Sequence, residues 1–539
     1  MIIINDVKIE TLNNFASFIN NKFMSLILPI ENELPSSFAD RVGLQYSSNI
    51  SQVVKRNKGQ FFTPLSISRF MSKLAKKTAH TISILDPGCG VAILSCCLIE
   101  HLVKTYDINN IHLDTYEVDT ILLPFTEKVL DYLCEWLNKQ NIVFSYSISK
   151  EDFVLENAYV LCDNELLFNS KTSVKYDFVI SNPPYFKLAK DDPKTVAALP
   201  LINGQPNIYS IFMAISAKLL KPDGEMIFIT PRSFASGRYF RKFREYLFSI
   251  VDVKFVHLFN TRKYTFTNDN VLQETIITKC TTKKDIDNHT VTISYSEGVI
   301  DLDRSSSKEY HEKDIIDKES AEKILYLPVS KREDLIFKLF QSWNGSLNKY
   351  GLQISTGPVV AFRTRDSISN VKTSDSVPLY WLHNVVKMLC DHPVLKSGKP
   401  QYIKIDEKST PLLLQNKDYI LLRRFSSKDD QSRLIAAPYF GNISSYKYIG
   451  FENKLNYIYR PKGHLLREEV MGIAALLNSD IFDSYFRIFN GNVNVSATEL
   501  RAMPFPDLEV IKAIGKELIF INDFSINNTN MIVNKFFDL

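Results

Sequence analysis

Short apolar runs alternate with helical patterns between about residues 80 and 280. The runs "TISILDPG", "IHLDTYEVD", "YDFVISNPPY" and "EMIFITP" are rich in β-branched and aromatic residues and have the length of buried strands. The run "AILSCCLIEHLVKTY" predicts a helix, and residues 238–248 predict another. A further helix is predicted by apolar residues at i, i+3, i+4, i+7 and i+11, which are Ile208, Ile211, Phe212, Ile215 and Leu219. This alternation predicts an α/β fold with an open parallel sheet covered on both faces.

The pattern changes after about residue 285. The polar stretch "DLDRSSSKEYHEKDIIDKESAEK" is expected to be a linker or an exposed excursion, which places a domain boundary near residues 310–330. Beyond it, "YILLRRF", "RLIAAPYF", "YKYIGF" and "LNYIYR" predict small strands, and one helical segment is expected from about Arg467 to Phe489. The expected division is an N-terminal helical extension (1–57), a first domain (58–310), a second domain (330–510) and a C-terminal tail (511–539).

Composition narrows the class of protein. A hydrophobic fraction of 45% and a charged fraction of 23% are those of an ordinary folded protein. The net charge of +4 is small for 539 residues, so contact with a polyanion would depend on local basic patches. The seven cysteines show no metal-ligand spacing, so reduced thiols in a cytosolic protein without a metal site are expected. Without a signal segment or a run of about 18 apolar residues, neither export nor membrane insertion is expected.

Two predicted strands end in residues that suit a nucleoside ligand. Open α/β sheets bind ligands at the carboxyl ends of their strands. The turn "DPGCG" after the first strand could bring a ligand close to a helix N-terminus, although a plain strand-to-helix connection explains it as well. Glu117, after the second strand, could accept both hydroxyls of a ribose, and a helix cap is the alternative.

Residues at the end of the next predicted strand also suit a nucleoside ligand. In "SKEDFV", Asp152 could accept from an adenine amino group and Phe153 could stack on the ring, although a turn acid and a core phenylalanine are equally economical. The turn after the first strand lacks both GxGxxG and GxxxxGK[ST], so neither a dinucleotide nor a triphosphate is favoured. An adenosine-containing cofactor of another kind is the interpretation that remains.

The stretch "SNPPYF" ends a strand in an unusual way. Two consecutive prolines cannot continue a strand ladder, so the chain must bend stiffly. In that geometry the Asn182 side-chain oxygen and the Pro183 carbonyl can both accept from one exocyclic amine, while the Tyr185 ring lies against the heterocycle that carries it. Two such acceptors direct the nitrogen lone pair towards an electrophile without a charged base. A structural turn with a buried tyrosine is the alternative.

Taken in order, these motifs resemble a known family. "KGQFFTPLSISRFM", "DPGCG", "YEVD", "EDF" and "SNPPYF" resemble the motifs of S-adenosylmethionine-dependent DNA adenine-N6 methyltransferases of the gamma arrangement, in which the target-recognition domain comes last. "YILLRRFSSKDDQSRLIAAPYF", "FENKLNYIYRPKG" and "NGNVNVSATELRAMPFPDL" resemble the recognition half of the BsuBI/PstI-like type II restriction-modification methylases. The resemblance implies a Rossmann-like S-adenosylmethionine-binding domain followed by a mixed α+β target-recognition domain.

The resemblance also implies roles for single residues. The cofactor would be held by residues from four motifs: Thr63, Pro64, Asp86, Gly88, Gly90, Glu117, Asp152 and Phe153. Of these, Thr63 and Pro64 would close over the methionine part, Glu117 would bind the ribose, and Asp152 with Phe153 would hold the adenine. In one departure from the family pattern, "CGVA" stands where the family often has CGxG, so that Ala92 replaces the last glycine.

A second set of implied roles concerns the reaction. The catalytic loop would consist of Asn182, Pro183, Pro184 and Tyr185, and Phe266 in "FTNDNVLQETI" would be a second stacking partner for the target base. The target adenine would have to rotate out of the duplex. Its amine would then attack the sulfonium methyl group directly, helped by alignment and charge placement. No covalent enzyme intermediate is needed, so Cys89 is not expected to act as a nucleophile.

The second domain would read double-stranded DNA. Cations suit phosphates, whereas amides and arginines suit base edges. The candidates are Arg423, Arg424, Arg433, Lys462, Asn492 and Asn494, all of which are equally well explained as solvated positions or turn formers. The expected assembly is a monomer whose functional partner is a separately encoded restriction endonuclease.

Three alternatives remain open from the sequence. An NPPY loop can also present an amine in RNA or a protein amide, although a C-terminal half of more than 200 residues favours a DNA-reading module. A combined restriction and modification enzyme would need a nuclease domain, for which the sequence offers no convincing acid constellation. A catalytically silent DNA-binding subunit would not need Asn182, Tyr185 and Glu117.

Overall fold

The computed structural model describes residues 27–48, 50, 62–76, 79–161, 174–201, 206–259, 274–284, 289–318, 320, 322–426, 430–490 and 495–538. The chain divides into two compact units, Met1–Leu325 and Tyr326–Leu539. The boundary lies within the interval that the sequence suggested. Phe266, Asn492 and Asn494 lie outside the described residues, so their predicted roles have no structural counterpart here.

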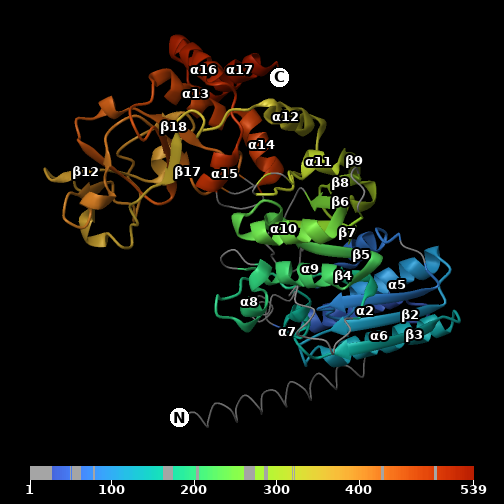
Figure 1. Ribbon diagram of the computed structural model, residues 1–539. Helices are drawn as coiled ribbons and strands as arrows, with labels where there is room; N and C mark the ends of the chain where they lie inside the picture. Colours follow the sequence, from blue (N-terminus) through green and yellow to red (C-terminus); the bar gives the residue numbers. More distant parts are fainter. Residues whose placement is uncertain are drawn as a thin grey trace, which may run out of the picture. The chain divides into compact units, whose positions relative to one another are not determined.

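The first unit is built on a nine-stranded sheet in the order β3-β2-β1-β4-β5-β7-β6-β8-β9 (Figure 1). Its strands are β1 (Thr81–Pro87), β2 (Asn110–Tyr116), β3 (Val143–Ser149), β4 (Tyr176–Ser181), β5 (Leu220–Pro231), β6 (Val251–Phe259), β7 (Thr275–Thr282), β8 (Thr290–Ser296) and β9 (Ser306–His311). The strands β1 to β5 pair in parallel, and β7 is antiparallel to both β5 and β6. The predicted α/β class and Rossmann-like architecture of this half are confirmed.

Helices of the first unit are α2 (Pro35–Ser48), α4 (Leu65–Ser72), α5 (Ile93–Thr105), α6 (Leu123–Asn138), α7 (Phe153–Asn157), α8 (Pro193–Ala197), α9 (Ile208–Lys218), α10 (Arg241–Ile250) and α11 (Glu312–Ile315). In the strand order, β1, β2 and β3 follow one another towards one edge of the sheet, whereas β4 and β5 follow one another towards the other edge. Right-handed crossovers therefore put α5 and α6 on one face and α9 on the opposite face. On the α5 face, α2 and α4 complete a core that includes Phe38, Ile67 and Leu98, each fully buried.

The predicted linker after residue 285 was wrong in part. Its segment Ser306–His311 forms β9, which pairs antiparallel with β8 at the edge of the sheet. Most of its side chains are exposed, as the sequence suggested. Polar side chains did not prevent pairing, because an edge strand needs only one backbone partner, and charged residues such as Lys308 are common there.

The second unit contains small sheets rather than one large one. Its strands are β10 (Gln353–Thr356), β11 (Ile368–Ser369), β12 (Ser376–Tyr380), β13 (Val385–Val386), β14 (Leu389–Cys390), β15 (Tyr402–Lys404), β16 (Leu414–Gln415), β17 (Tyr419–Arg423), β18 (Ala436–Tyr439), β19 (Tyr448–Phe451) and β20 (Leu455–Tyr459). They form sheets in the orders β10-β20-β17-β18, β11-β15-β12-β19-β16 and β13-β14. The four apolar runs that predicted strands are β17 to β20.

Helices of the second unit are α12 (Lys331–Ser342), α13 (Arg467–Asn478), α14 (Asp480–Phe489), α15 (Ala497–Ala502), α16 (Leu508–Ile521) and α17 (Ile526–Phe537). The predicted single helix from Arg467 to Phe489 is broken at Ser479, whose backbone is extended and whose side chain accepts from Phe482 N to start α14. The predicted tail from residue 511 is likewise corrected, because α16 begins earlier and packs against α13.

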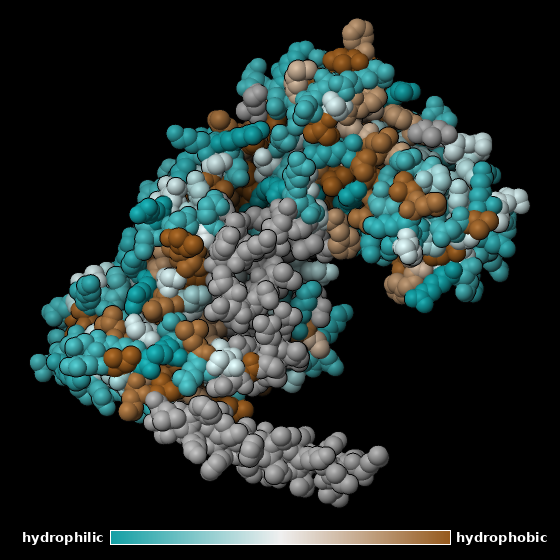
Figure 2. All heavy atoms as spheres, turned by 180° about the vertical axis from the view of Figure 1, so that it is seen from behind, coloured by the Kyte–Doolittle hydropathy of each residue, from teal (hydrophilic) through white to brown (hydrophobic). Residues whose placement is uncertain are grey.

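On the face that Figure 2 shows, apolar surface is scattered. Figure 2 shows one face of the molecule, on which hydrophobic side chains form small separate groups among hydrophilic ones. Within the part of the chain that the structure describes, no helix is long and apolar enough to cross a membrane.

Candidate functional site

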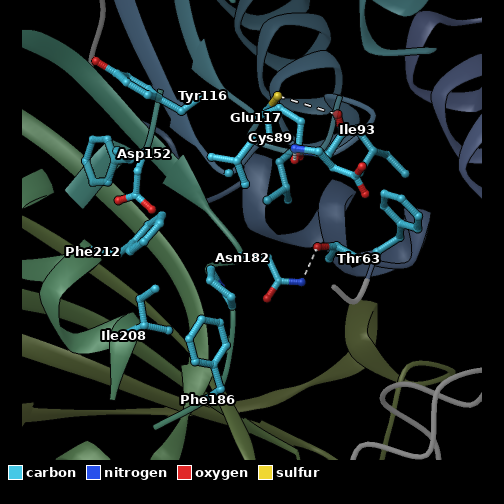
Figure 3. A pocket seen from close by; sticks show the side chains of 18 of the residues that line it. Thr63, Cys89, Ile93, Tyr116, Glu117, Asp152, Asn182, Phe186, Ile208 and Phe212 are labelled. Atoms are coloured by element: carbon cyan, nitrogen blue, oxygen red, sulfur yellow. Dashed lines mark hydrogen bonds between the residues drawn. The ribbon is translucent and has the colours of Figure 1, made fainter. Parts of the chain in front are cut away.

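A cavity of about 540 Å³ lies in the first unit, where strands of the central sheet end (Figure 3). Its wall is formed by residues from seven places in the sequence: Phe62, Thr63, Gly88, Cys89, Gly90, Ile93, Leu94, Tyr116, Glu117, Val118, Asp119, Thr120, Ile121, Asp152, Phe153, Asn182, Pro184, Phe186, Lys194, Ile208 and Phe212. Most of them directly follow the carboxyl ends of β1, β2, β3 or β4. This is the position at which open α/β sheets bind ligands.

The glycine turn after β1 is held in a conformation that few other residues adopt. Gly88 and Gly90 have φ of 76° and 57°, and a Cβ on Gly90 would lie 3.0 Å from Cε1 of Phe62. Gly88 N and Cys89 N both donate to Tyr116 O, at 2.9 and 3.0 Å, which ties the turn to the end of β2. The turn therefore brings backbone to the cavity without side chains that would fill it.

Ala92, where the related family often has glycine, also adopts a left-handed conformation with φ 59°. An L-residue in this region costs about 1–2 kcal/mol relative to ordinary backbone. The residue is fully buried and precedes the first residue of α5. Ala92 in place of glycine therefore strains the backbone locally, and the turn keeps its conformation.

Glu117 presents its carboxylate at the cavity wall from the end of β2. Its Oε2 accepts from Gly90 N at 3.1 Å, and its Oε1 accepts from Asp119 N at 2.8 Å. The side chain is therefore fixed between the glycine turn and its own loop, and the residue is 8% exposed. A carboxylate has about four acceptor sites in total, so one such group can accept from several donors at once.

Asp86 does not face the cavity, which corrects one detail of the prediction. The residue is fully buried, and its Oδ2 accepts from Ser95 Oγ at 2.6 Å. Burial raises the pKa of Asp86 to about 7, with the nearby charge of Glu117 acting in the same direction. Asp86 therefore shapes the turn from behind, whereas Glu117 faces the ligand space.

Asp152 is a helix cap that also lies at the cavity wall. It caps α7, because its Oδ1 accepts from Val154 N at 3.0 Å and from Leu155 N at 3.1 Å. It also lines the cavity. The adjacent Phe153 is 2% exposed, and its ring lies 5.1 Å from that of Tyr116 and 5.0 Å from that of Phe212.

Several wall residues were not among the predicted site residues, and they include Phe186, Lys194, Ile208 and Phe212. Ile208 and Phe212 belong to the apolar face of α9, and a helical period cannot separate side chains of the core from those of a cavity wall. Phe186 stood next to the predicted loop. For Lys194 the sequence offered no signal, since only the folded chain brings α8 to the cavity.

The Asn182 amide lies at the cavity and is held from both sides. Figure 3 shows the amide directed towards Thr63, where Nδ2 donates to Oγ1 at 3.0 Å. Tyr185 Oη donates to Asn182 Oδ1 at 2.5 Å and lies 2.9 Å from Ile229 O. Burial and the neighbouring Tyr209 raise the pKa of Tyr185 well above its ordinary value, so the hydroxyl remains a donor.

The remaining predicted residues of the site lie around it. Pro183 is buried and Pro184 lines the cavity, whereas Pro64 precedes α4 and is not part of the wall. Cys89 lies in the wall as a neutral thiol, because burial and the charges of Asp86 and Glu117 raise its pKa well above the ordinary value. A neutral thiol is a poor nucleophile.

Among the predicted DNA-binding residues, Arg433 requires correction. It is 0% exposed, its Nε donates to Ser426 Oγ and its Nη2 donates to Asn490 Oδ1, each at 3.1 Å. A side chain enclosed in this way braces the second unit and cannot reach a phosphate. The sequence could not show this, because a buried and an exposed arginine look alike among aromatic neighbours.

Other predicted cations of the second unit are more accessible. Arg423 and Arg424 are half-buried, and each donates to a backbone carbonyl, Val385 O at 2.6 Å and Asn453 O at 3.0 Å respectively. Lys462 is exposed.

Known proteins share both halves of this architecture. Residues 94–266 match the family of Eco57I restriction-modification methylases. The chain is 33% identical over 469 residues to the type II methyltransferase M.BsuBI of Bacillus subtilis, covering 86% of this chain and 91% of that protein. The chain belongs to this family of type II restriction-modification methyltransferases.

Further relatives extend the similarity over nearly the whole length. The type II methyltransferase M.PstI of Providencia stuartii is 29% identical over 506 residues, 93% of this chain and 98% of that protein. Among solved structures, a DrdV–DNA complex aligns with a TM-score of 0.48 at 14% identity, covering 90% of this chain and 59% of that one. The type IIG restriction endonuclease BpuSI aligns with a TM-score of 0.45 at 13% identity, covering 90% and 62% respectively.

Membership of this family makes the chain a DNA methyltransferase that uses S-adenosylmethionine. The relatives give no support to an RNA or protein substrate. The cavity suits the cofactor, because it combines a backbone-lined glycine turn, a fixed carboxylate and an aromatic wall.

Proposed function

We propose that the protein methylates the N6 amine of adenine within a specific sequence of duplex DNA. The observation that carries this proposal is the Asn182 amide, which is positioned at the cavity by Thr63 and Tyr185. An amide oxygen next to a backbone carbonyl is the arrangement needed to accept both hydrogens of an exocyclic amine. No charged base is required for that interaction.

The cofactor would be held by the residues that line the cavity. Glu117 accepts the ribose hydroxyls, Asp152 accepts the adenine amine, and Phe153 and Phe212 enclose the ring. Thr63 stands beside Asn182, at the reacting end. S-adenosylmethionine supplies an electrophilic methyl group, and the protein contributes alignment with the target amine.

In the protein without DNA, the Tyr185 hydroxyl is bound to Asn182 Oδ1, the oxygen that the target amine needs as an acceptor. Its hydroxyl donates to Asn182 Oδ1, so binding of a flipped adenine replaces that bond with one from the amine. Tyr185 then stacks on the base through its ring. Asn182 keeps its bond to Thr63 throughout, and Oδ1 remains directed at the substrate.

The second unit would contact DNA through exposed cations, of which Lys462 is the most accessible of those predicted. Its contacts with phosphates would make binding fall with rising salt concentration. A separately encoded restriction endonuclease would be the functional partner, and the protein would act as a monomer on DNA in the cytoplasm.

Transfer of tritiated methyl groups from S-adenosylmethionine tests the substrate class. Unmodified plasmid DNA, total RNA and cell-extract protein are offered separately to the purified enzyme. Label is expected in DNA alone and is expected to be lost in an Asn182→Ala variant that still binds S-adenosylhomocysteine. Label in RNA or protein at a comparable rate would contradict the proposal.

A further inference from the structure

Lys194 contributes a cation to the cavity wall, and neither the motifs nor the relatives assign it a role. Its Nζ lies 3.3 Å from Asp152 Oδ2. Both side chains are largely sheltered, with exposed fractions of 23% for Lys194 and 29% for Asp152. An ion pair in such a place is less screened by water than one on the open surface.

The two oxygens of Asp152 have different partners. Oδ1 accepts from two backbone N–H groups at the start of α7, Val154 N and Leu155 N. Oδ2 faces Lys194. Because Oδ1 is already committed to the helix, Oδ2 is the oxygen that is suited to accept from an adenine amine.

The backbone around Lys194 is braced. Asp192 Oδ1 accepts from Lys194 N at 2.9 Å and so caps α8, and Thr195 Oγ1 donates to Ala189 O at 2.7 Å. The excursion that carries α8 starts directly after the catalytic loop. Its two ends are joined by hydrogen bonds from Leu188 N to Pro206 O at 3.0 Å and from Ile208 N to Phe186 O at 3.1 Å.

We propose that Lys194 is a positioning residue that orients Asp152 towards the cofactor adenine and thereby couples the segment after the catalytic loop to cofactor binding. This inference rests on the assignment of the cavity to S-adenosylmethionine. When adenine enters, it excludes water from the Asp152–Lys194 pair, which strengthens the pair. Coupling of this kind is reciprocal, so cofactor binding also stabilises α8 against the cavity.

The first test measures the dissociation constant of S-adenosylhomocysteine by calorimetry. Lys194→Met removes the charge and keeps most of the length of the side chain, and it is expected to weaken binding about tenfold. Lys194→Arg keeps a cation and is expected to recover most of the affinity. Lys190→Met is the matched control, because Lys190 is exposed in the same segment and does not line the cavity.

A double-mutant cycle with Asp152→Asn tests whether Lys194 acts through Asp152. Asparagine can still cap α7 but carries no charge. Lys194→Met is expected to change affinity little in the Asp152→Asn background. An equally large loss in both backgrounds would overturn the proposal, since Lys194 would then contact the cofactor independently.

Hydrogen exchange provides a readout that separates coupling from a purely structural effect. Saturating S-adenosylhomocysteine is expected to slow amide exchange in residues 188–201 of the wild type and to have little effect there in Lys194→Met. Equal slowing in both proteins would contradict the coupling. If the wild type binds no S-adenosylhomocysteine, the cofactor assignment itself fails and this inference fails with it.

Discussion

Asn182 connects two segments that are 119 residues apart in the sequence, because its amide donates to Thr63 while its oxygen accepts from Tyr185. The sequence predicted both the loop and the segment of Thr63, but as separate motifs with separate ligands. Their contact could not be read from the sequence, since it depends on how the segment before α4 folds over the end of β4. In the structure, the same threonine lines the cavity and accepts from the Asn182 amide.

Thr63→Val should therefore slow methyl transfer. Valine has nearly the same shape but offers no acceptor to Asn182 Nδ2, so the amide loses an orienting bond of about 1–2 kcal/mol. Single-turnover rates on duplex DNA are expected to fall about tenfold. Thr63→Ser retains the oxygen and is the matched control; equal rates for the two variants would remove the orienting role.

The raised pKa of Asp86 makes the stability of the folded protein depend on pH. Its pKa in the folded protein is about 7, far above the 3.8 of an ordinary aspartate. Between about pH 4 and pH 7, the carboxyl group is therefore protonated in the folded state and ionised in the unfolded state. The contribution of this group to stability is therefore largest below about pH 4, falls as pH rises, and is fully lost above about pH 7.

Asp86→Asn is neutral at every pH and can still accept from Ser95. Between pH 5 and pH 7, the stability of the variant relative to the wild type should rise by about 2 kcal/mol. Thermal midpoints measured across this range would show the difference growing with pH. Asp191→Asn, at an exposed position, should show no such trend; a flat difference for Asp86→Asn would mean that Asp86 ionises at its ordinary pKa.

Elements were predicted well where one apolar pattern decides them and less well where tertiary contacts do. The runs that became β1, β2, β4 and β17 were recognisable because burial of a strand needs only a local stretch of apolar residues. The break at Ser479 was missed because apolar residues continue on both sides of it at helical spacing. Likewise, no local pattern indicated that α16 would pack against α13.

The crossing of α13 and α16 depends on two glycines. A Cβ on Gly515 would lie 1.9 Å from Glu468 O, and one on Gly472 would lie 2.0 Å from Ile511 O. Gly515→Ala must therefore push the helices apart, with an expected loss of about 3 kcal/mol in the free energy of unfolding of the second unit. Chemical denaturation measures this, with Lys516→Ala, exposed on the same helix, as control. A loss below that of the control variant would show that the helices are not in close contact.

At the scale of the whole molecule, the cofactor cavity lies entirely within residues of the first unit. A fragment of residues 1–325 is accordingly expected to bind S-adenosylhomocysteine with nearly the affinity of the full chain. The same fragment should lose preference for any DNA sequence, because the second unit would supply that recognition. Calorimetry measures cofactor binding, and competition binding measures the preference for a DNA sequence. Loss of cofactor binding in a folded fragment would contradict the assignment of cofactor binding to the first unit alone.

The proposed reaction is tested most simply by mass spectrometry of nucleosides from DNA incubated with the purified protein and S-adenosylmethionine. We expect N6-methyladenine, formed by the wild type and absent with Asn182→Ala, and no methylated cytosine. Methylation of cytosine N4 would keep the mechanism but contradict the assigned base. No methylated base on several unmodified genomic DNAs, from a protein that binds S-adenosylhomocysteine, would contradict the central claim.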